Sequence, residues 1–296
     1  MVELLTLPDG RLLEYLTGGD PDGFPFVHHY GTPTAVVEDR TLSDTVARAG
    51  LRLVTYSRPG YGASTPRPEV GEWPVPIAAD VDDTVLLLEH LGIGDFVTLG
   101  WSGGGPRALA CGALLPERCR AVATLAGVAP YGVDGLDWTA GMGPENVRDF
   151  EAARIGREAF RPLADEQTAE LAQVGGDDIV AALGGLVDEV DAAALTGDFA
   201  DHLAATFRHS VAQGAVGMLE DNLQIVRPWG FDVRDITVPV SVWQGAHDKM
   251  VPYDHGRWLA RAIPGARAHL HDDEGHLSLV AKLDEILADL RDLAGL

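Results

Sequence analysis

The 296-residue chain has few cysteines and no long apolar run. Its two cysteines, Cys111 and Cys119, are too few for a disulfide framework and lack the spacing of metal ligands. We expect both to be buried free thiols. No window reaches the ~18 apolar residues that a membrane helix needs, and the N-terminus lacks a basic stretch followed by an apolar one. These absences predict a cytoplasmic protein that does not enter the membrane.

Positive charge is also scarce. Lys and Arg number 22 against 45 Asp and Glu, a net charge of −23, and Lys249 and Lys282 are the only lysines. So acidic a surface repels nucleic acid and anionic membranes, which argues against both as partners. The expected partner is a small-molecule substrate, and the sequence leaves the oligomeric state open.

What the chain does contain is an alternation of strand and helix patterns. Two short alternating runs, 4–7 and 11–16, flank Pro8-Asp9-Gly10, which is typical of a hairpin. Further strands are expected at 24–29, 51–56, 96–101 and 121–126, with helices at 36–49, at 76–90 and from Ser102 to about residue 115. This order predicts a mostly parallel sheet flanked by helices, with antiparallel strands at one edge.

The alternation stops between residues 131 and 230 and then resumes. Strands are expected again at 238–244 and 266–271, with helices at 255–262 and 279–290. The intervening stretch holds helical patches at 179–195 and 199–212, and carries 18 acidic residues against 6 basic ones. We therefore predict a core of 1–130 and 231–296, interrupted by a helical insertion of 131–230.

The most informative stretch is Gly100-Trp101-Ser102-Gly103-Gly104, which fits the pattern G-x-S-x-G. That pattern suits a strained turn between a strand and a helix, which exposes a serine hydroxyl at the top of a sheet. A serine needs a base and an orienting acid to become a nucleophile.

Two later positions supply the acid and the base in the order Ser, Asp, His. Asp248 follows the strand at 238–244, and His276 follows the strand at 266–271. Both therefore fall at the carboxyl edge of the sheet, where ligands of α/β proteins bind. The nearby alternatives are Asp254 for the acid and His269 or His271 for the base; we expect both histidines to be structural, and Asp272 and Asp273 to form a turn.

The motifs GWSGGG, GAHDKMVP, EGH, YGTP and SRPGYGAS together resemble those of the α/β-hydrolase fold family, over residues 4–126 and 237–290. The resemblance implies that Ser102 is the nucleophile, Asp248 the acid and His276 the base, and that the insertion is a helical cap. The oxyanion hole would then use the backbone N–H groups of Gly103 and Thr32. Tyr30 stands where the family usually has histidine. No metal or organic cofactor is implied.

Several apolar side chains are candidates for the substrate pocket. Trp101 precedes the nucleophile and either lines the acyl pocket or packs against the sheet. In the insertion, Met142, Phe207 and Met218 are candidates for contact with substrate, with ordinary core packing as the alternative.

The constellation predicts acyl transfer by a carboxylesterase-like serine hydrolase acting on a small or medium ester. The alternatives are a carbon–carbon bond hydrolase and an aminopeptidase like proline iminopeptidase, whose cap would hold an ammonium with acids such as Glu145, Asp149, Glu220 and Asp221. A non-catalytic ligand receptor on the same fold is an alternative of another class. A serine nucleophile argues against dehalogenases and epoxide hydrolases, which use aspartate.

Overall fold

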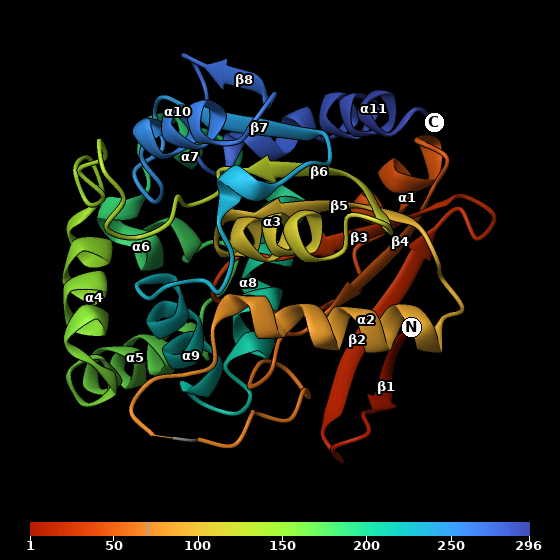
Figure 1. The fold of residues 1–296 in the computed structure, drawn as a ribbon. Helices are drawn as coiled ribbons and strands as arrows, with labels where there is room; N and C mark the ends of the chain where they lie inside the picture. The colour runs from red at the N-terminus through yellow and green to blue at the C-terminus, as the bar shows by residue number, and fades with distance from the viewer. Residues whose placement is uncertain (70) are drawn as a thin grey trace.

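The computed structural model describes residues 1–69 and 71–296 and is built on one eight-stranded sheet (Figure 1). The strands follow the order β1-β2-β4-β3-β5-β6-β7-β8. Their bounds are β1 (Val2–Thr6), β2 (Leu12–Gly19), β3 (Phe24–His29), β4 (Leu51–Tyr56), β5 (Phe96–Trp101), β6 (Cys119–Leu125), β7 (Val240–Gly245) and β8 (Arg267–His271). β1 and β2 pair antiparallel, as do β2 and β4, and all other neighbours pair parallel. The predicted mostly parallel sheet with an antiparallel edge is confirmed.

All six residues of β5 are buried, because helices cover both faces of the sheet. The flanking helices are α1 (Arg40–Arg48), α2 (Asp80–His90), α3 (Gly105–Leu114), α10 (Tyr253–Ala262) and α11 (Leu283–Ala294). Both α3 and α11 pack against β5 and β6, and α3 lies in front of them in Figure 1. α1 begins four residues later than predicted, because Asp39 caps it by accepting the N–H of Leu42.

Six helices lie between β6 and β7 in the chain. They are α4 (Pro144–Ile155), α5 (Arg157–Leu171), α6 (Ile179–Leu183), α7 (Glu189–Ala194), α8 (Gly197–Ser210) and α9 (Val216–Ile225). Figure 1 shows them beside the carboxyl ends of the parallel strands. The predicted helical patch at 179–195 is wrong as one unit: Gly184 has a φ of +54° and ends α6, and α7 starts anew after Asp188.

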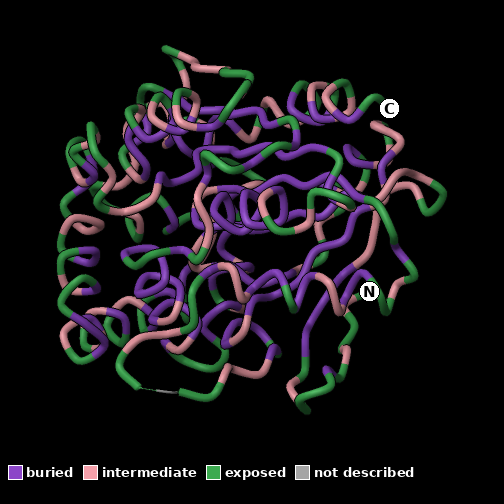
Figure 2. The backbone as a smooth tube through the Cα atoms, in the orientation of Figure 1, coloured by how far each residue is buried: buried purple, intermediate pink, exposed green. Residues whose placement is uncertain are grey.

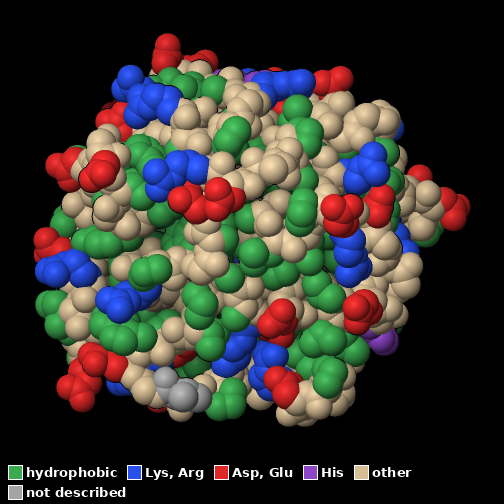
Figure 3. All heavy atoms as spheres, viewed as in Figure 1, with side chains coloured by type: hydrophobic (Ala, Val, Ile, Leu, Met, Phe, Trp, Pro, Cys, Tyr) green, Lys and Arg blue, Asp and Glu red, His purple; other side chains and the backbone are tan. Residues whose placement is uncertain are grey.

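The inserted helices share the hydrophobic core of the sheet. Phe160, Leu203 and Leu219 belong to the same buried cluster as Phe26 and Leu99. In Figure 2, buried backbone runs through the strands and recurs along the inserted helices between intermediate and exposed segments. On the face drawn in Figure 3, Asp and Glu alternate with Lys and Arg. Within the described residues, no helix has the length and apolar character that crossing a membrane requires.

Candidate active site

Ser102 occupies a sharp turn at the carboxyl end of β5. It follows Trp101, the last residue of the strand, and begins the single 3-10 turn Ser102–Gly104 that leads into α3. Its φ of +54° is a conformation that costs a residue with a side chain roughly 1–3 kcal/mol. The side chain reaches the cavity described below. The geometry is that of the strained turn that the G-x-S-x-G pattern predicts.

The glycines after Ser102 allow the loop that follows β3 to approach the turn. A side-chain carbon on Gly104 would collide with the carbonyl oxygen of His29, and one on Gly103 would collide with the Thr32 hydroxyl. The same carbon on Gly103 would lie 3.4 Å from the Thr32 nitrogen. The two predicted oxyanion donors therefore lie side by side, next to Ser102.

Asp248 and His276 form a buried hydrogen-bonded pair. The His276 Nδ1 lies 2.8 Å from Asp248 Oδ2, and both side chains are almost fully buried. Since a carboxylate only accepts hydrogen bonds, Nδ1 carries the proton and Nε2 is left as the basic nitrogen. The carboxylate is fixed by three further donors: Gln244 Nε2 at 2.8 Å and the N–H groups of Met250 and Val251 at 2.8 and 2.7 Å.

The charge environment favours a basic imidazole at His276. Burial by itself disfavours the imidazolium, but the negative charge and hydrogen bond of Asp248 outweigh it, with a smaller contribution from Asp191, so the pKa of His276 is raised. Ser102 and His276 line the same cavity. Among the hydrogen bonds of the described residues none joins Ser102 to His276, a contact that tightens in many hydrolases only when substrate binds.

The cavity over Ser102 has a volume of about 220 Å³ and draws its walls from the sheet loops and from the inserted helices. Three predicted pocket residues, Trp101, Phe207 and Met218, line it. Met142 is buried in the hydrophobic core and is not among the residues that line this cavity, so its predicted contact with substrate gains no support here and stays a prediction. Trp101 also borders a second cavity of about 590 Å³.

The four acids proposed for holding an ammonium have different surroundings. Glu145 and Asp149 line the cavity. Glu220 is paired with Arg157 at 2.6 Å, and Asp221 is buried between Arg58 and Arg107. Glu220 and Asp221 are therefore unavailable to a substrate ammonium, which corrects that expectation for both.

The nearby alternatives to the triad residues lie elsewhere. Asp254 is exposed at the start of α10 and accepts a bond from Arg257. His269 stacks on Trp243 with ring centroids 3.8 Å apart, and His271 stacks on the same ring at 5.7 Å, as expected for structural residues. Asp272 and Asp273 lie in a turn, and Cys111 and Cys119 are free and buried.

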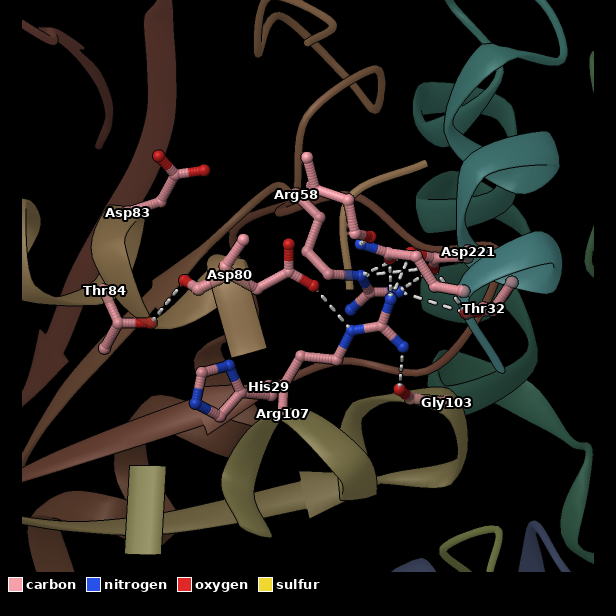
Figure 4. Close-up of polar contacts among 12 residues, drawn as sticks. His29, Thr32, Arg58, Asp80, Asp83, Thr84, Gly103, Arg107 and Asp221 are labelled. Atoms are coloured by element: carbon pink, nitrogen blue, oxygen red, sulfur yellow. Dashed lines mark hydrogen bonds and ion pairs between the residues drawn. The ribbon is translucent and has the colours of Figure 1, made fainter. Parts of the chain in front are cut away.

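A buried polar network contacts the loop after β3 that carries Thr32 (Figure 4). This network was not predicted from the sequence. Asp221 of α9 accepts bonds from Arg58, Arg107, Tyr61 and Thr32. Although burial favours the neutral acid, the two guanidinium groups lower the pKa of Asp221 to about 2. The available signal was Arg107, a charged residue in an otherwise apolar helix, but its partner lies 114 residues away in the chain.

A second buried carboxylate, Asp191 of α7, holds the His276 loop and was also missed. It accepts the backbone N–H groups of His276, Leu277 and Ser278 at 2.8–2.9 Å. A side-chain carbon on Gly275 would collide with this carboxylate, so the glycine makes the approach feasible. In the sequence Asp191 looks like any helical acid.

Comparison with known proteins agrees with this architecture. The sequence profile of the alpha/beta hydrolase fold matches residues 25–282. The chain is 24% identical to an uncharacterized hydrolase, YcgS, of Bacillus subtilis over 95% of this chain and 93% of that protein. It is also 24% identical to a probable proline iminopeptidase of Leptolyngbya boryana, over 94% of this chain and 89% of the relative.

A solved hydrolase from Pseudomonas aeruginosa has the same fold, with a TM-score of 0.70 at 20% identity, covering 100% of this chain and 98% of that one. The profile match spans well over half of the residues and includes the Ser102 turn, Asp248 and His276. The chain belongs to the α/β hydrolase fold family.

Proposed function

We propose that this protein is a serine hydrolase that cleaves a small or medium carboxylic ester through an acyl-enzyme. One observation carries the proposal: the strained Ser102 turn opens into the same cavity as His276, whose other ring nitrogen is bound to Asp248 at 2.8 Å. A nucleophile, a base and an orienting acid in this arrangement perform acyl transfer.

The reaction then runs in two halves. His276 Nε2 takes the proton of Ser102 as Oγ attacks the ester carbonyl, and the N–H groups of Thr32 and Gly103 stabilise the oxyanion. The imidazolium returns that proton to the leaving alkoxide as the carbon–oxygen bond breaks. Water then gives a proton to His276 as it attacks the acyl carbonyl, and the imidazolium passes that proton to Ser102 Oγ as the acyl–oxygen bond breaks, which releases the acid and free Ser102.

The inserted helices, 131–230, act in this proposal as a cap over the core of 1–130 and 231–296. Residues of α4, α5, α6, α8 and α9 supply much of the cavity wall, including the apolar side chains Phe150, Leu203, Phe207 and Met218. Such a wall excludes water and favours a neutral, apolar acyl or alcohol group. A volume near 220 Å³ suits a small substrate.

Asp149 supports a second candidate, an aminopeptidase. Its carboxylate lines the cavity, accepts a bond from Gln167, and has one buried oxygen, Oδ1, without a hydrogen bond among the described residues. Burial raises the pKa of Asp149, and a substrate ammonium would reverse that effect. The iminopeptidase relative is consistent with this reading. Against it, Arg148 also lines the cavity and lies 3.5 Å from Asp149, where it would repel an ammonium.

The test combines labelling and turnover. A fluorophosphonate should modify Ser102 in the wild type, and p-nitrophenyl acetate or butyrate should be hydrolysed faster than proline or alanine anilides. Labelling without turnover of any ester or anilide would favour a carbon–carbon bond hydrolase, and neither labelling nor turnover would favour a ligand receptor. Preferential cleavage of anilides would establish the aminopeptidase instead.

A further inference from the structure

The insertion directs two buried carboxylates at the core, Asp191 and Asp221, and they contact different parts of the proposed catalytic site. Asp191 is 0% and Asp221 3% exposed. Neither lines the cavity over Ser102. Both come from helices of the insertion, while their partners belong to the core: Asp191 binds the loop that carries His276, and Asp221 binds Thr32 and, through Arg107, reaches Gly103.

Asp221 holds the loop that carries Thr32 in two ways, through the Thr32 hydroxyl and through Arg58. The Thr32 hydroxyl donates to Asp221 Oδ2 at 2.6 Å. Arg58, held by the same carboxylate, donates to the Gly31 carbonyl at 2.8 Å and to the Tyr30 carbonyl at 2.6 Å. The Gly31 carbonyl and the Thr32 N–H belong to one planar trans peptide, so holding the oxygen fixes the opposite direction for the N–H.

Asp221 also reaches Gly103 through Arg107, at the carbonyl of the peptide that follows the one carrying the Gly103 N–H. Arg107 donates to Asp221 Oδ1 at 2.8 Å and to the Gly103 carbonyl at 2.8 Å, and its Nε donates to Asp80 at 3.0 Å (Figure 4). One carboxylate of α9 is therefore the shared anchor of both residues whose N–H groups would bind the oxyanion. Figure 4 shows bonds from this cluster both to Thr32 and to Gly103.

Asp191 fixes the base in a comparable way. Its Oδ2 accepts the N–H of His276, and its Oδ1 accepts those of Leu277 and Ser278. These three successive donors define the backbone from which the imidazole projects toward Asp248. Two charged groups act on that imidazole: Asp248 from the loop after β7, and Asp191 from α7.

We propose that Asp191 and Asp221 are positioning residues of the hydrolysis: the insertion aligns the base and the oxyanion hole as well as covering the cavity. Both roles rest on the proposed hydrolysis at Ser102. The two carboxylates act only through other groups, so their loss is felt in the transition state, where alignment matters, and hardly in substrate binding.

The experiment compares Asp221→Asn and Asp191→Asn with matched neighbours on the same helices. Glu220→Gln is the control for α9, and Glu189→Gln, an exposed acid of α7, is the control for α7. For each folded variant kcat and KM on p-nitrophenyl butyrate are measured, together with inhibition by a trifluoromethyl ketone, which forms a tetrahedral oxyanion on the serine.

We expect kcat to fall about 10- to 100-fold in each Asp variant, with KM changed less than about threefold and both controls within about twofold of wild type. Inhibition by the ketone should weaken with kcat in Asp221→Asn. In Asp191→Asn the acid limb of the pH–rate profile should also move to lower pH, because a negative charge facing His276 is lost.

Folding could complicate Asp221→Asn, since it leaves two buried guanidinium groups with one fewer counter-charge. Thr32→Val removes the hydroxyl, with its bonds to Asp221 and to Arg58, but keeps the charges paired, and it should lower kcat in the same direction. Variants that fold and keep kcat within threefold of their controls would overturn the inference while wild type still takes the fluorophosphonate label. A wild type that takes no label and cleaves no ester would refute the proposed function, and this inference with it.

Discussion

The loops at the carboxyl edge of the sheet and the helices between β6 and β7 contribute different kinds of group to one site. The loops carry the atoms that would react or bind the oxyanion: Ser102, His276 and Asp248, with Thr32 and Gly103 beside them. The helices carry the cavity wall and, in Asp191 and Asp221, carboxylates whose partners lie in those loops.

In our proposal, chemistry and alignment are encoded at different distances along the chain. Each loop group lies in a short local motif, whereas Thr32 and Asp221 are 189 residues apart and Asp191 and His276 are 85 apart. The proposed cap, tied to the core by such bonds, would differ from one that only covers the cavity, because replacing it would change the rate of the chemical step as well as substrate choice.

The largest effect is expected for the loop groups, beginning with the nucleophile. Ser102→Ala should lower kcat/KM by at least ~10⁴-fold, because no other group in the site can form the acyl-enzyme. The fold should persist, since alanine removes only the hydroxyl; circular dichroism would verify this. Turnover like that of wild type in the alanine variant, or a fluorophosphonate label on another residue, would refute the assignment of Ser102.

His276→Ala should be nearly as damaging, and Asp248→Asn should cost about 10²–10⁴-fold, because the amide no longer holds the imidazole with its basic nitrogen toward Ser102. The double variant Ser102→Ala/His276→Ala should be no slower than either single variant. Losses that multiply in the double variant would mean that the two residues act independently, which the proposed mechanism does not allow.

The pH dependence follows from the direction of the His276 shift. Only the neutral imidazole accepts the serine proton, and Asp248 raises the pKa of His276 above its ordinary value near 6.5. Wild-type kcat/KM should therefore fall as pH decreases through a midpoint above that value. A profile that is flat between about pH 5 and pH 8 would contradict the proposed role of His276.

Local patterns located the strands and the loops that follow them, and distance along the chain explains the contacts that they missed. β3 and β4 were predicted residue for residue, since short apolar runs bounded by turn residues identify strands. Ser102, Asp248 and His276 lie one to five residues beyond the strands that present them. Asp191 and Asp221 have no such local signature, because the sequence alone does not distinguish a buried aspartate from an exposed one when its partners are distant in the chain.

The residues of the cavity wall were harder to predict than the positions of the strands, for a related reason. An apolar helix residue satisfies burial equally well against the sheet or against a ligand, so the sequence could not separate Met142, which packs in the core, from Phe207 and Met218, which line the cavity. The outcome depends on helix rotation, which the break at Gly184 and the packing of α4 to α9 determine only in three dimensions.

A smaller effect, selective for the class of substrate, is expected when Asp149 of the insertion is replaced. Under the ester proposal, Asp149→Asn should change turnover of neutral esters by less than about tenfold, or ~1.4 kcal/mol, because no substrate charge meets this carboxylate. Glu220→Gln is the matched control, since its carboxylate is held by Arg157 outside the cavity wall. A collapse of activity on amino-acid anilides alone would show that Asp149 binds an ammonium and would favour the aminopeptidase.

The smallest effect on kcat is expected for a bond between core and insertion that does not contact the loops carrying the proposed reacting groups. Glu14 on β2 accepts bonds from Ser57 at 2.6 Å and from His209 of α8 at 2.8 Å. The hydrogen bond to Glu14 raises the pKa of His209 despite burial. Burial of Glu14 favours its neutral form, but His209 and Ser57 outweigh it and lower the pKa of Glu14.

The ion pair therefore stabilises the fold between these two pKa values. The contribution of His209 is fully present below its unfolded pKa and is lost as pH rises through its raised folded pKa; that of Glu14 is lost as pH falls through its lowered one. Since His209 is one-third exposed, the pair is worth less than about 1 kcal/mol. The difference in unfolding free energy between wild type and Glu14→Gln, measured with urea, should thus decrease as the pH rises from about 6 to about 8.

Catalysis should be indifferent to the same substitution. Because Glu14 is not among the residues lining the cavity over Ser102, and its bonds reach Ser57 and His209 rather than Thr32 or His276, kcat of folded Glu14→Gln should stay within about twofold of wild type. A tenfold fall in kcat would erase the distinction between Asp191 and Asp221 and any other core–insertion bond. Alignment would then depend on how firmly the whole insertion is seated, and the two carboxylates would have no special part in it.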